Sequence, residues 1–313
     1  MTSPPHRLPQ DPTSRTALAL ADPEAPYDGL MPKALRGLAL ASHPGPAVVV
    51  TLVAVLLAVS VGYSPWRAVL LAVAILAGQL FVGWSNDAID ARRDTLVRRA
   101  DKPVAMGLVS RRAVGTSAVV AVVLALACTA ALGVAALVAH AIALASAFAY
   151  NAWLKRTLAS VLPYVVSFGV LPAIVTLGLP TPAFPTWWVI VAGCLLGAAA
   201  HVTNVLPDLE TDSATGVRGF GHVLGARRGG VFSFTALGLA GIDIGLGASL
   251  VGGLTGWPLA IAVLAACLTV VLAIVGASLT LRGMRSRWLM RLVMTSAVVI
   301  VIGLIAAGPV VTA

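Results

Sequence analysis

The chain has 313 residues, of which 59% are hydrophobic and only 11% are charged, and its formal net charge is +9. In a soluble domain about a quarter of all residues are charged. This composition therefore excludes an ordinary soluble protein and indicates a protein embedded in lipid. A basic protein raises the question of nucleic-acid binding, but here the Lys and Arg residues lie in short segments between apolar runs. We therefore expect no nucleic-acid partner.

The amino-terminal segment is rich in Pro, Asp, Ser and Thr and has no long apolar run. This composition predicts a disordered cytosolic tail over residues 1–43, with a short interfacial segment around Leu35 to Leu40. No apolar stretch near the start has the character of a signal peptide, so we expect no cleavage there. The rest of the chain, 44–313, is predicted to form one membrane domain.

A helix that crosses a bilayer needs about 20 apolar residues, and the chain offers nine such segments in succession. They are 44–62, 67–85, 112–131, 133–150, 159–178, 186–206, 230–251, 256–280 and 288–311. The predicted fold is therefore all-α, a polytopic membrane protein with about nine transmembrane helices in a bundle.

The basic residues fix the predicted orientation of these helices. With nine spans, every Lys and Arg except Arg67 falls on the side of the amino-terminal tail. Because positively charged loops stay in the cytosol, we expect the amino terminus and the second, fourth, sixth and eighth loops to be cytosolic.

Two of these cytosolic ends carry the same polar pattern. Both Asn86–Asp90–Asp94 and Asn204–Asp208–Asp212 read N-x-x-x-D-x-x-x-D. Residues four apart share one face of a helix, so each motif predicts a row of oxygen-bearing side chains where a span ends. Asp87 can join the first row, whereas Glu210 points away from the second.

Paired rows of this kind suit magnesium, which prefers oxygen ligands and is usually held by one or two carboxylates together with substrate phosphates. A single row has an alternative interpretation as a solvated face that balances nearby arginines, but the repeat at equivalent helix ends favours a diphosphate site. The predicted ligands of Mg²⁺ are Asn86, Asp87, Asp90, Asp94, Asn204, Asp208 and Asp212.

The motifs also resemble those of a known family. Segments 86–94 and 204–212 look like the first and second aspartate-rich motifs of the UbiA superfamily of intramembrane prenyltransferases. Segment 101–107 is similar to that family's R-P-x-x-x-G loop, with Lys102 where the family usually has Arg, and segment 150–156 resembles its Tyr…Lys-Arg segment. The resemblance covers roughly residues 45–310. It implies a nine-helix bundle around a central cavity.

The resemblance also implies roles for single residues. The expected catalytic residues are Asp90, Asp94, Asp208 and Asp212, and the expected diphosphate-binding residues are Lys102, Lys155, Arg218 and Tyr150. The basic members of the second set have the alternative role of fixing the orientation, and Tyr150 that of an interfacial aromatic residue. Two further polar residues in apolar segments stay open. His201 either lines an acceptor pocket or packs between helices, and Asp243 has no counterpart in the family.

These expectations define a function. The protein is predicted to be a prenyltransferase of the cell membrane that moves a prenyl group from a prenyl diphosphate to a small acceptor after magnesium-assisted ionisation, and the expected acceptor is aromatic. Membrane lipid is its expected surrounding. The same scaffold also serves phosphoribosyl transfer to a polyprenyl phosphate and terpene cyclisation. A small-solute transporter is the alternative from another class, but it would need charged groups near the bilayer midplane, where only Asp243 qualifies.

Overall fold

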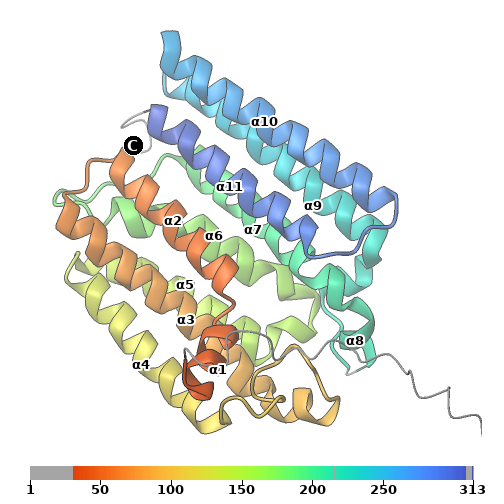
Figure 1. Ribbon diagram of the computed structural model, residues 1–313. Coiled ribbons are helices and arrows are strands. Elements are labelled where there is room, and N and C mark those ends of the chain that lie inside the picture. Colours follow the sequence, from red (N-terminus) through yellow and green to blue (C-terminus); the bar gives the residue numbers. More distant parts are fainter. Residues whose placement is uncertain (1–30, 215, 308–311, 313) are drawn as a thin grey trace, which may run out of the picture.

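Helices make up almost all of the computed structural model, which describes residues 31–214, 216–307 and 312 (Figure 1). Within those residues no β-sheet forms, and the predicted all-α fold is confirmed. The first 30 residues of the predicted tail lie outside the described residues. The helices are α1 (Lys33–Ala41), α2 (Pro44–Ser60), α3 (Pro65–Leu96), α4 (Arg111–Ala130), α5 (Val134–Ala152), α6 (Leu162–Thr176), α7 (Trp187–Val205), α8 (Leu209–Ala214), α9 (Phe220–Leu246), α10 (Gly256–Leu281) and α11 (Trp288–Ala307).

The number of membrane spans agrees with the sequence prediction. Eight helical segments of the described chain are long and apolar enough to cross a membrane, and the pair α1 and α2, bent by 60°, supplies a ninth. Two boundaries differ clearly from the prediction. Helix α3 continues to Leu96, far beyond residue 85, and α9 begins at Phe220 rather than 230, with a kink at Gly225 where φ is 70°.

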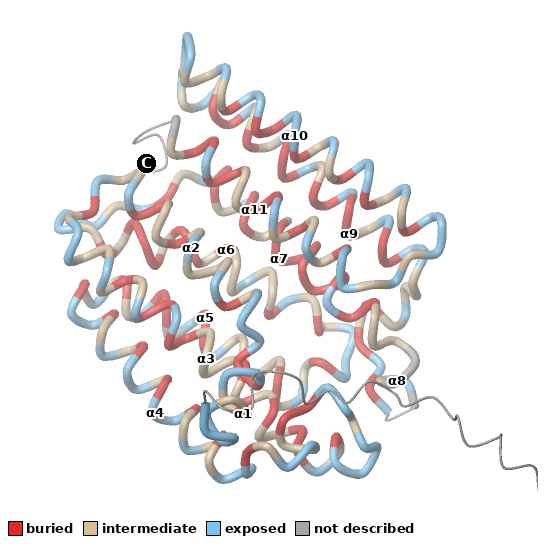
Figure 2. Tube along the Cα trace, in the orientation of Figure 1, coloured by how far each residue is buried: buried red, intermediate tan, exposed pale blue. Residues whose placement is uncertain are grey.

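The spanning helices are arranged as a ring. Neighbours in the ring are α2, α3, α5, α6, α7, α9, α10 and α11, and α11 packs against α2 to close it. Helix α4 packs against α3 and α5 at the edge of the bundle (Figure 1). Burial follows this arrangement, because 72% of the α7 span is buried but only 28% of α4 (Figure 2). Helix α7 therefore forms the interior wall, and α4 presents most of its surface outward.

Close helix contacts in the ring depend on small residues, as is common in membranes. A Cβ atom at Gly197 of α7 would collide with the carbonyl oxygen of Tyr164 in α6. At Gly193, one turn away on the same helix, a Cβ would lie 2.5 Å from the carbonyl oxygen of Phe168. The backbones of α6 and α7 therefore approach as closely as they do only because α7 carries glycine on this face.

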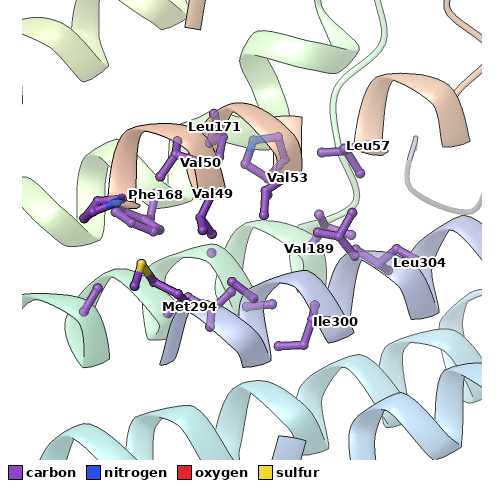
Figure 3. Close-up of a pocket in the computed structure, with 18 of the residues that line it drawn as sticks. Val49, Val50, Val53, Leu57, Phe168, Leu171, Val189, Met294, Ile300 and Leu304 are labelled. Atoms are coloured by element: carbon purple, nitrogen blue, oxygen red, sulfur yellow. The ribbon is translucent and has the colours of Figure 1, made fainter. Parts of the chain in front are cut away.

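An apolar cavity of about 760 Å³ lies between α2, α6, α7 and α11. Figure 3 shows side chains of these helices converging on it, among them Val53, Phe168, Val189 and Ile300. All of its lining residues are Val, Leu, Ile, Ala, Met, Phe, Pro or Gly. The structure thus contains the central cavity that the family resemblance implies.

Helix α1 lies at one end of the bundle, the end at which α8 is also found (Figure 1). The Trp84 Nε1–H of α3 donates a hydrogen bond of 2.8 Å to the Leu38 carbonyl oxygen of α1. Leu35 and Leu40 on α1 are about half exposed, and this short helix stands where the sequence predicted the end of a disordered tail. We call this end, which also holds both aspartate motifs, the charged end.

Candidate active site

The first aspartate motif lies on a continuous helix. Because α3 extends to Leu96, Asn86, Asp90 and Asp94 share one face of it, as the spacing predicts. The side chains face the protein rather than bulk water, since Asp87, Asp90 and Asp94 are only 2%, 3% and 2% exposed. Three buried carboxylates within eight residues require nearby positive charge.

Two lysines supply part of that charge. The Lys102 ammonium group, from the loop after α3, lies 2.7 Å from Asp87 Oδ1. Lys155, in the 3₁₀ turn η2 (Leu154–Arg156), lies 2.6 Å from Asp90 Oδ2 and 3.2 Å from Asn86 Oδ1. Burial lowers the pKa of Lys155, and the neighbouring Asp90 only partly offsets this effect. Both lysines expected from the sequence therefore converge on the first motif.

Arg93 is a third cation of this group that the sequence does not single out. Its guanidinium group lies 3.1 Å from Asp90 Oδ2 and 3.2 Å from Asp94 Oδ1. Its position inside the first motif, next to Asp94, is a signal that could have identified it. In a sequence with many arginines at helix ends, that signal is weak.

The second motif departs from the predicted single helical face. Helix α7 ends at Val205, a 3₁₀ turn η4 (Leu206–Asp208) follows, and α8 begins at Leu209. Pro207 explains the break, because proline has no N–H to donate to the preceding turn. Asn204, Asp208 and Asp212 therefore belong to three different elements. The prediction of one regular row is wrong for this motif.

Each residue of the second motif nevertheless has a polar neighbour near the site. The Asn204 amide donates a hydrogen bond of 3.2 Å to the Tyr164 hydroxyl oxygen. Asp208 Oδ1 lies 3.5 Å from the Arg99 guanidinium group, and Asp212 Oδ2 lies 3.6 Å from His222 Nε2. These partners come from distant parts of the chain, and no sequence spacing reveals them.

Arg99 and Tyr150 connect the two motifs. Arg99, just beyond α3, holds Asp208 and also donates two hydrogen bonds of 2.8 Å to Asp101, which keeps the Asp101 pKa at about 2. The Tyr150 hydroxyl lies within electrostatic range of Asp90, Asp208 and Asp212. Arg99 therefore links the segment after the first motif to Asp208 of the second motif.

Tyr150 and His201 belong to an aromatic cluster with Tyr164. The Tyr150 ring packs edge-on against Tyr164 and His201, at centroid distances of 5.2 and 5.7 Å. His201 is buried, and its Nε2 lies 3.2 Å from the Ser160 hydroxyl. His201 lines neither the apolar cavity nor the smaller cavity described below, so the structure favours a packing role for it.

Two other candidates form no ion pair with the aspartate motifs among the described residues. Arg218 is exposed and forms no ion pair with the part of the chain that the structure describes. Asp243 lies near the other end of α9, and its buried Oδ2 has no hydrogen-bond partner among the described residues. Asp243 is therefore distant from the aspartate motifs, whereas Val217, next to Arg218, donates a backbone hydrogen bond of 2.9 Å to the Asp212 carbonyl oxygen.

The donor set fits magnesium shared with a diphosphate. No three His, Cys, Asp or Glu side chains of the described residues form a closed metal site. Magnesium does not require one, because it is commonly held by one or two carboxylates and completes its shell with phosphate oxygens and water. Buried carboxylate oxygens are at hand, and Asp87 Oδ2 has no hydrogen-bond partner within the described chain.

Comparison with known proteins gives a consistent result. The model of the UbiA prenyltransferase family matches residues 47–295. Among solved structures, a UbiA homolog from Aeropyrum pernix K1 is 20% identical with a TM-score of 0.68, covering 83% of this chain and 96% of that one. A UbiA homolog from Archaeoglobus fulgidus bound to DMAPP and Mg²⁺ is 14% identical with a TM-score of 0.67, covering 87% and 98%.

A structure of digeranylgeranylglyceryl phosphate synthase is also similar, at 14% identity and a TM-score of 0.61, covering 88% of this chain and 99% of that one. At these identities the solved structures establish the fold alone. No curated protein sequence matches the chain.

Proposed function

The chain belongs to the UbiA prenyltransferase family, and from that premise we propose that it transfers the prenyl group of a prenyl diphosphate to a small acceptor within the membrane. The observation that carries the proposal is the placement of a carboxylate and lysine cluster at the charged end of a ring of helices that encloses a wholly apolar cavity. A prenyl diphosphate has the same division into a charged head and an apolar tail.

The charged end would bind the diphosphate. The proposed magnesium ligands are those of the sequence analysis, the Asn and Asp residues of both motifs together with Asp87. When bound, magnesium would neutralise phosphate charge and make the diphosphate a better leaving group. Lys102 and Lys155 form ion pairs with Asp87 and Asp90, and from these positions their ammonium groups can donate hydrogen bonds to phosphate oxygens. Of the proposed diphosphate-binding residues, exposed Arg218 is the most peripheral.

The apolar cavity would hold the prenyl tail and keep water from the reacting carbon. In the proposed reaction the C–O bond to the diphosphate breaks, and its electron pair leaves with the diphosphate. The allylic cation then accepts an electron pair from a carbon of the acceptor, which loses a proton as the new C–C bond forms. The ring of Tyr150, beside both motifs, can stabilise the cation through its face.

Relatives with bound ligands support this reading of the cavity and the charged end. UbiA homologs from Archaeoglobus fulgidus have been solved with GPP and Mg²⁺ and with DMAPP and Mg²⁺. Those ligands combine a diphosphate, a divalent cation and a short prenyl chain. We propose the same class of donor for this chain.

The decisive test removes one carboxylate from each motif. Asp90→Asn and Asp208→Asn should each lower magnesium-dependent release of diphosphate from geranyl diphosphate by on the order of 100-fold or more, because each removes charge that positions the leaving group. Asp243→Asn, an acid outside the charged end, is the matched control and should leave the rate unchanged. Full activity in both motif variants would overturn the metal and diphosphate assignment.

A further inference from the structure

A second cavity, of about 440 Å³, lies between α2, α3, α5 and α6. It shares Val50, Phe168 and Leu171 with the apolar cavity, so the two are direct neighbours. Unlike the apolar cavity it has polar lining residues, namely Gln79, His140 and Ser167.

The second cavity also lies directly beneath the first motif. Gln79 and Val82 both line it, and they precede Asn86 by seven and four residues on α3. At this spacing the three residues share one helical face, and Gln79 is about 10 Å along the axis from Asn86. A small molecule in this cavity would sit on the membrane side of the proposed diphosphate site.

The hydrogen bonds around His140 favour one tautomer of its ring. The Thr129 hydroxyl donates its single hydrogen to the Ala125 carbonyl oxygen, at 2.7 Å. Thr129 Oγ1 also lies 2.7 Å from His140 Nδ1, so we assign this nitrogen as the donor of that second bond. In the neutral ring Nε2 is then left as a bare acceptor. His140 is 3% exposed and lines the second cavity.

The other two polar groups complement this acceptor. The Gln79 amide has no hydrogen-bond partner among the described residues, so it has both donors and an acceptor available. The Ser167 hydroxyl donates to the Ala143 carbonyl oxygen at 3.1 Å, which leaves its own oxygen able to accept. The cavity therefore offers acceptors for an O–H group and an amide donor for the oxygen of the same group.

Charge is absent from this arrangement. No Lys, Arg, Asp or Glu is found among the described residues that line either cavity. An acceptor with a carboxylate would lose its hydration here without gaining a cation, which is strongly unfavourable. A neutral hydroxyl group meets no such penalty.

We propose that the second cavity is the acceptor site and that it selects a neutral acceptor bearing a hydroxyl group, such as a phenol or naphthol, rather than an aromatic acid. This assignment rests on the proposed prenyl transfer. The acceptor hydroxyl donates to His140 Nε2 and accepts from the Gln79 amide. Gln79 and His140 bind the acceptor in this arrangement and take no part in ionising the donor.

Equilibrium binding tests the assignment without relying on turnover. The purified protein in detergent, supplied with Mg²⁺ and inorganic diphosphate, which has no prenyl group to transfer, is titrated with radiolabelled 1-naphthol, 1-methoxynaphthalene and 1-hydroxy-2-naphthoate against a detergent blank. We expect 1-naphthol to bind at least tenfold more tightly than the other two. Equal binding of the methyl ether, or tighter binding of the acid, would overturn the proposal.

Substitutions locate the site. Gln79→Leu and His140→Phe should each weaken 1-naphthol binding at least tenfold, whereas His140→Gln, which keeps an acceptor near the Nε2 position, should retain part of the affinity. Ser167→Ala and Ser146→Ala form a matched pair, because each serine donates to a carbonyl oxygen across α5 and α6 but only Ser167 lines the cavity. Ser146→Ala should bind 1-naphthol as the wild type does, and Ser167→Ala more weakly.

Binding of geranyl diphosphate with Mg²⁺ is the internal control for all variants. It should stay within twofold of the wild-type value in Gln79→Leu and His140→Phe, which shows that the fold and the donor site persist. Unchanged 1-naphthol affinity in both variants would overturn the acceptor assignment while the proposed function stands. Failure of the wild type to bind geranyl diphosphate with Mg²⁺ would instead overturn the proposed function, and the acceptor role with it.

Discussion

Individual ion pairs define the chemistry of the charged end. Asp87 and Asp90 are buried together with Lys102 and Lys155, so each charge depends on its partner for compensation. Removing one member of a buried pair leaves an uncompensated charge, which typically costs about 3–5 kcal/mol. These lysines are therefore expected to affect stability as well as donor binding.

The substitutions Lys155→Met and Arg156→Met compare the loss of a buried cation with the loss of an exposed cation at the next position. Lys155→Met should lower both the thermal unfolding temperature in detergent and the affinity for geranyl diphosphate, because Asp90 loses its closest partner. Arg156→Met should change the free energy of unfolding by less than about 0.5 kcal/mol, as surface substitutions usually do. Equal effects of the two substitutions would contradict the pairing of Lys155 with Asp90.

Among single residues, the sequence predicted the repeated Asn and Asp residues of the two motifs, but it missed the side chains that contact them. Asn86, Asp90 and Asp94 stand out because spacing within one helix is a local property. Arg99 next to Asp208, and His222 next to Asp212, depend on how distant segments pack. Local periodicity carries no information about such contacts, and the abundance of arginine at helix ends conceals them further.

For whole helices, too, the sequence predicted some features and missed others. The apolar runs located eight spans and the bent pair α1 and α2, but they placed the end of α3 at residue 85, whereas the helix continues through the polar motif to Leu96. Hydropathy reports where lipid ends, not where backbone hydrogen bonding ends. The break between α7 and α8 at Pro207 was readable in principle, because proline disrupts the preceding turn.

The packing of α6 on α7 yields a prediction for stability. Gly197→Ala adds a Cβ that collides with the Tyr164 carbonyl oxygen, so the two helices must separate, at a cost of typically about 1–3 kcal/mol. Gly238→Ala on α9 is the control, since its Cβ would lie an ordinary 3.6 Å from that of Ala273. Thermal unfolding in detergent should show a lower midpoint for Gly197→Ala alone. A midpoint equal to that of Gly238→Ala would show that α6 and α7 tolerate separation.

The molecule as a whole has two chemically different ends, and we propose that the charged end faces the cytosol. Arg156 is exposed at the charged end, and Trp257 is 70% exposed at the opposite end, at the start of α10. After replacement of the three native cysteines, a membrane-impermeant maleimide should label Trp257→Cys in intact cells. It should label Arg156→Cys only after the membrane is opened. The reverse pattern would show that the orientation inferred from positive charge is wrong.

The ring is completed by contact between its first and last spans, α2 and α11. Val53 and Leu57 of the one helix and Ile300 and Leu304 of the other face the same apolar cavity, although almost the whole chain separates them in sequence. A membrane protein is inserted from its amino terminus as it is synthesised. Both aspartate motifs are therefore in the membrane before the wall that shields the cavity exists. The residues proposed to hold metal and phosphate are therefore synthesised early, but the wall of the apolar cavity is completed only when the final helix arrives.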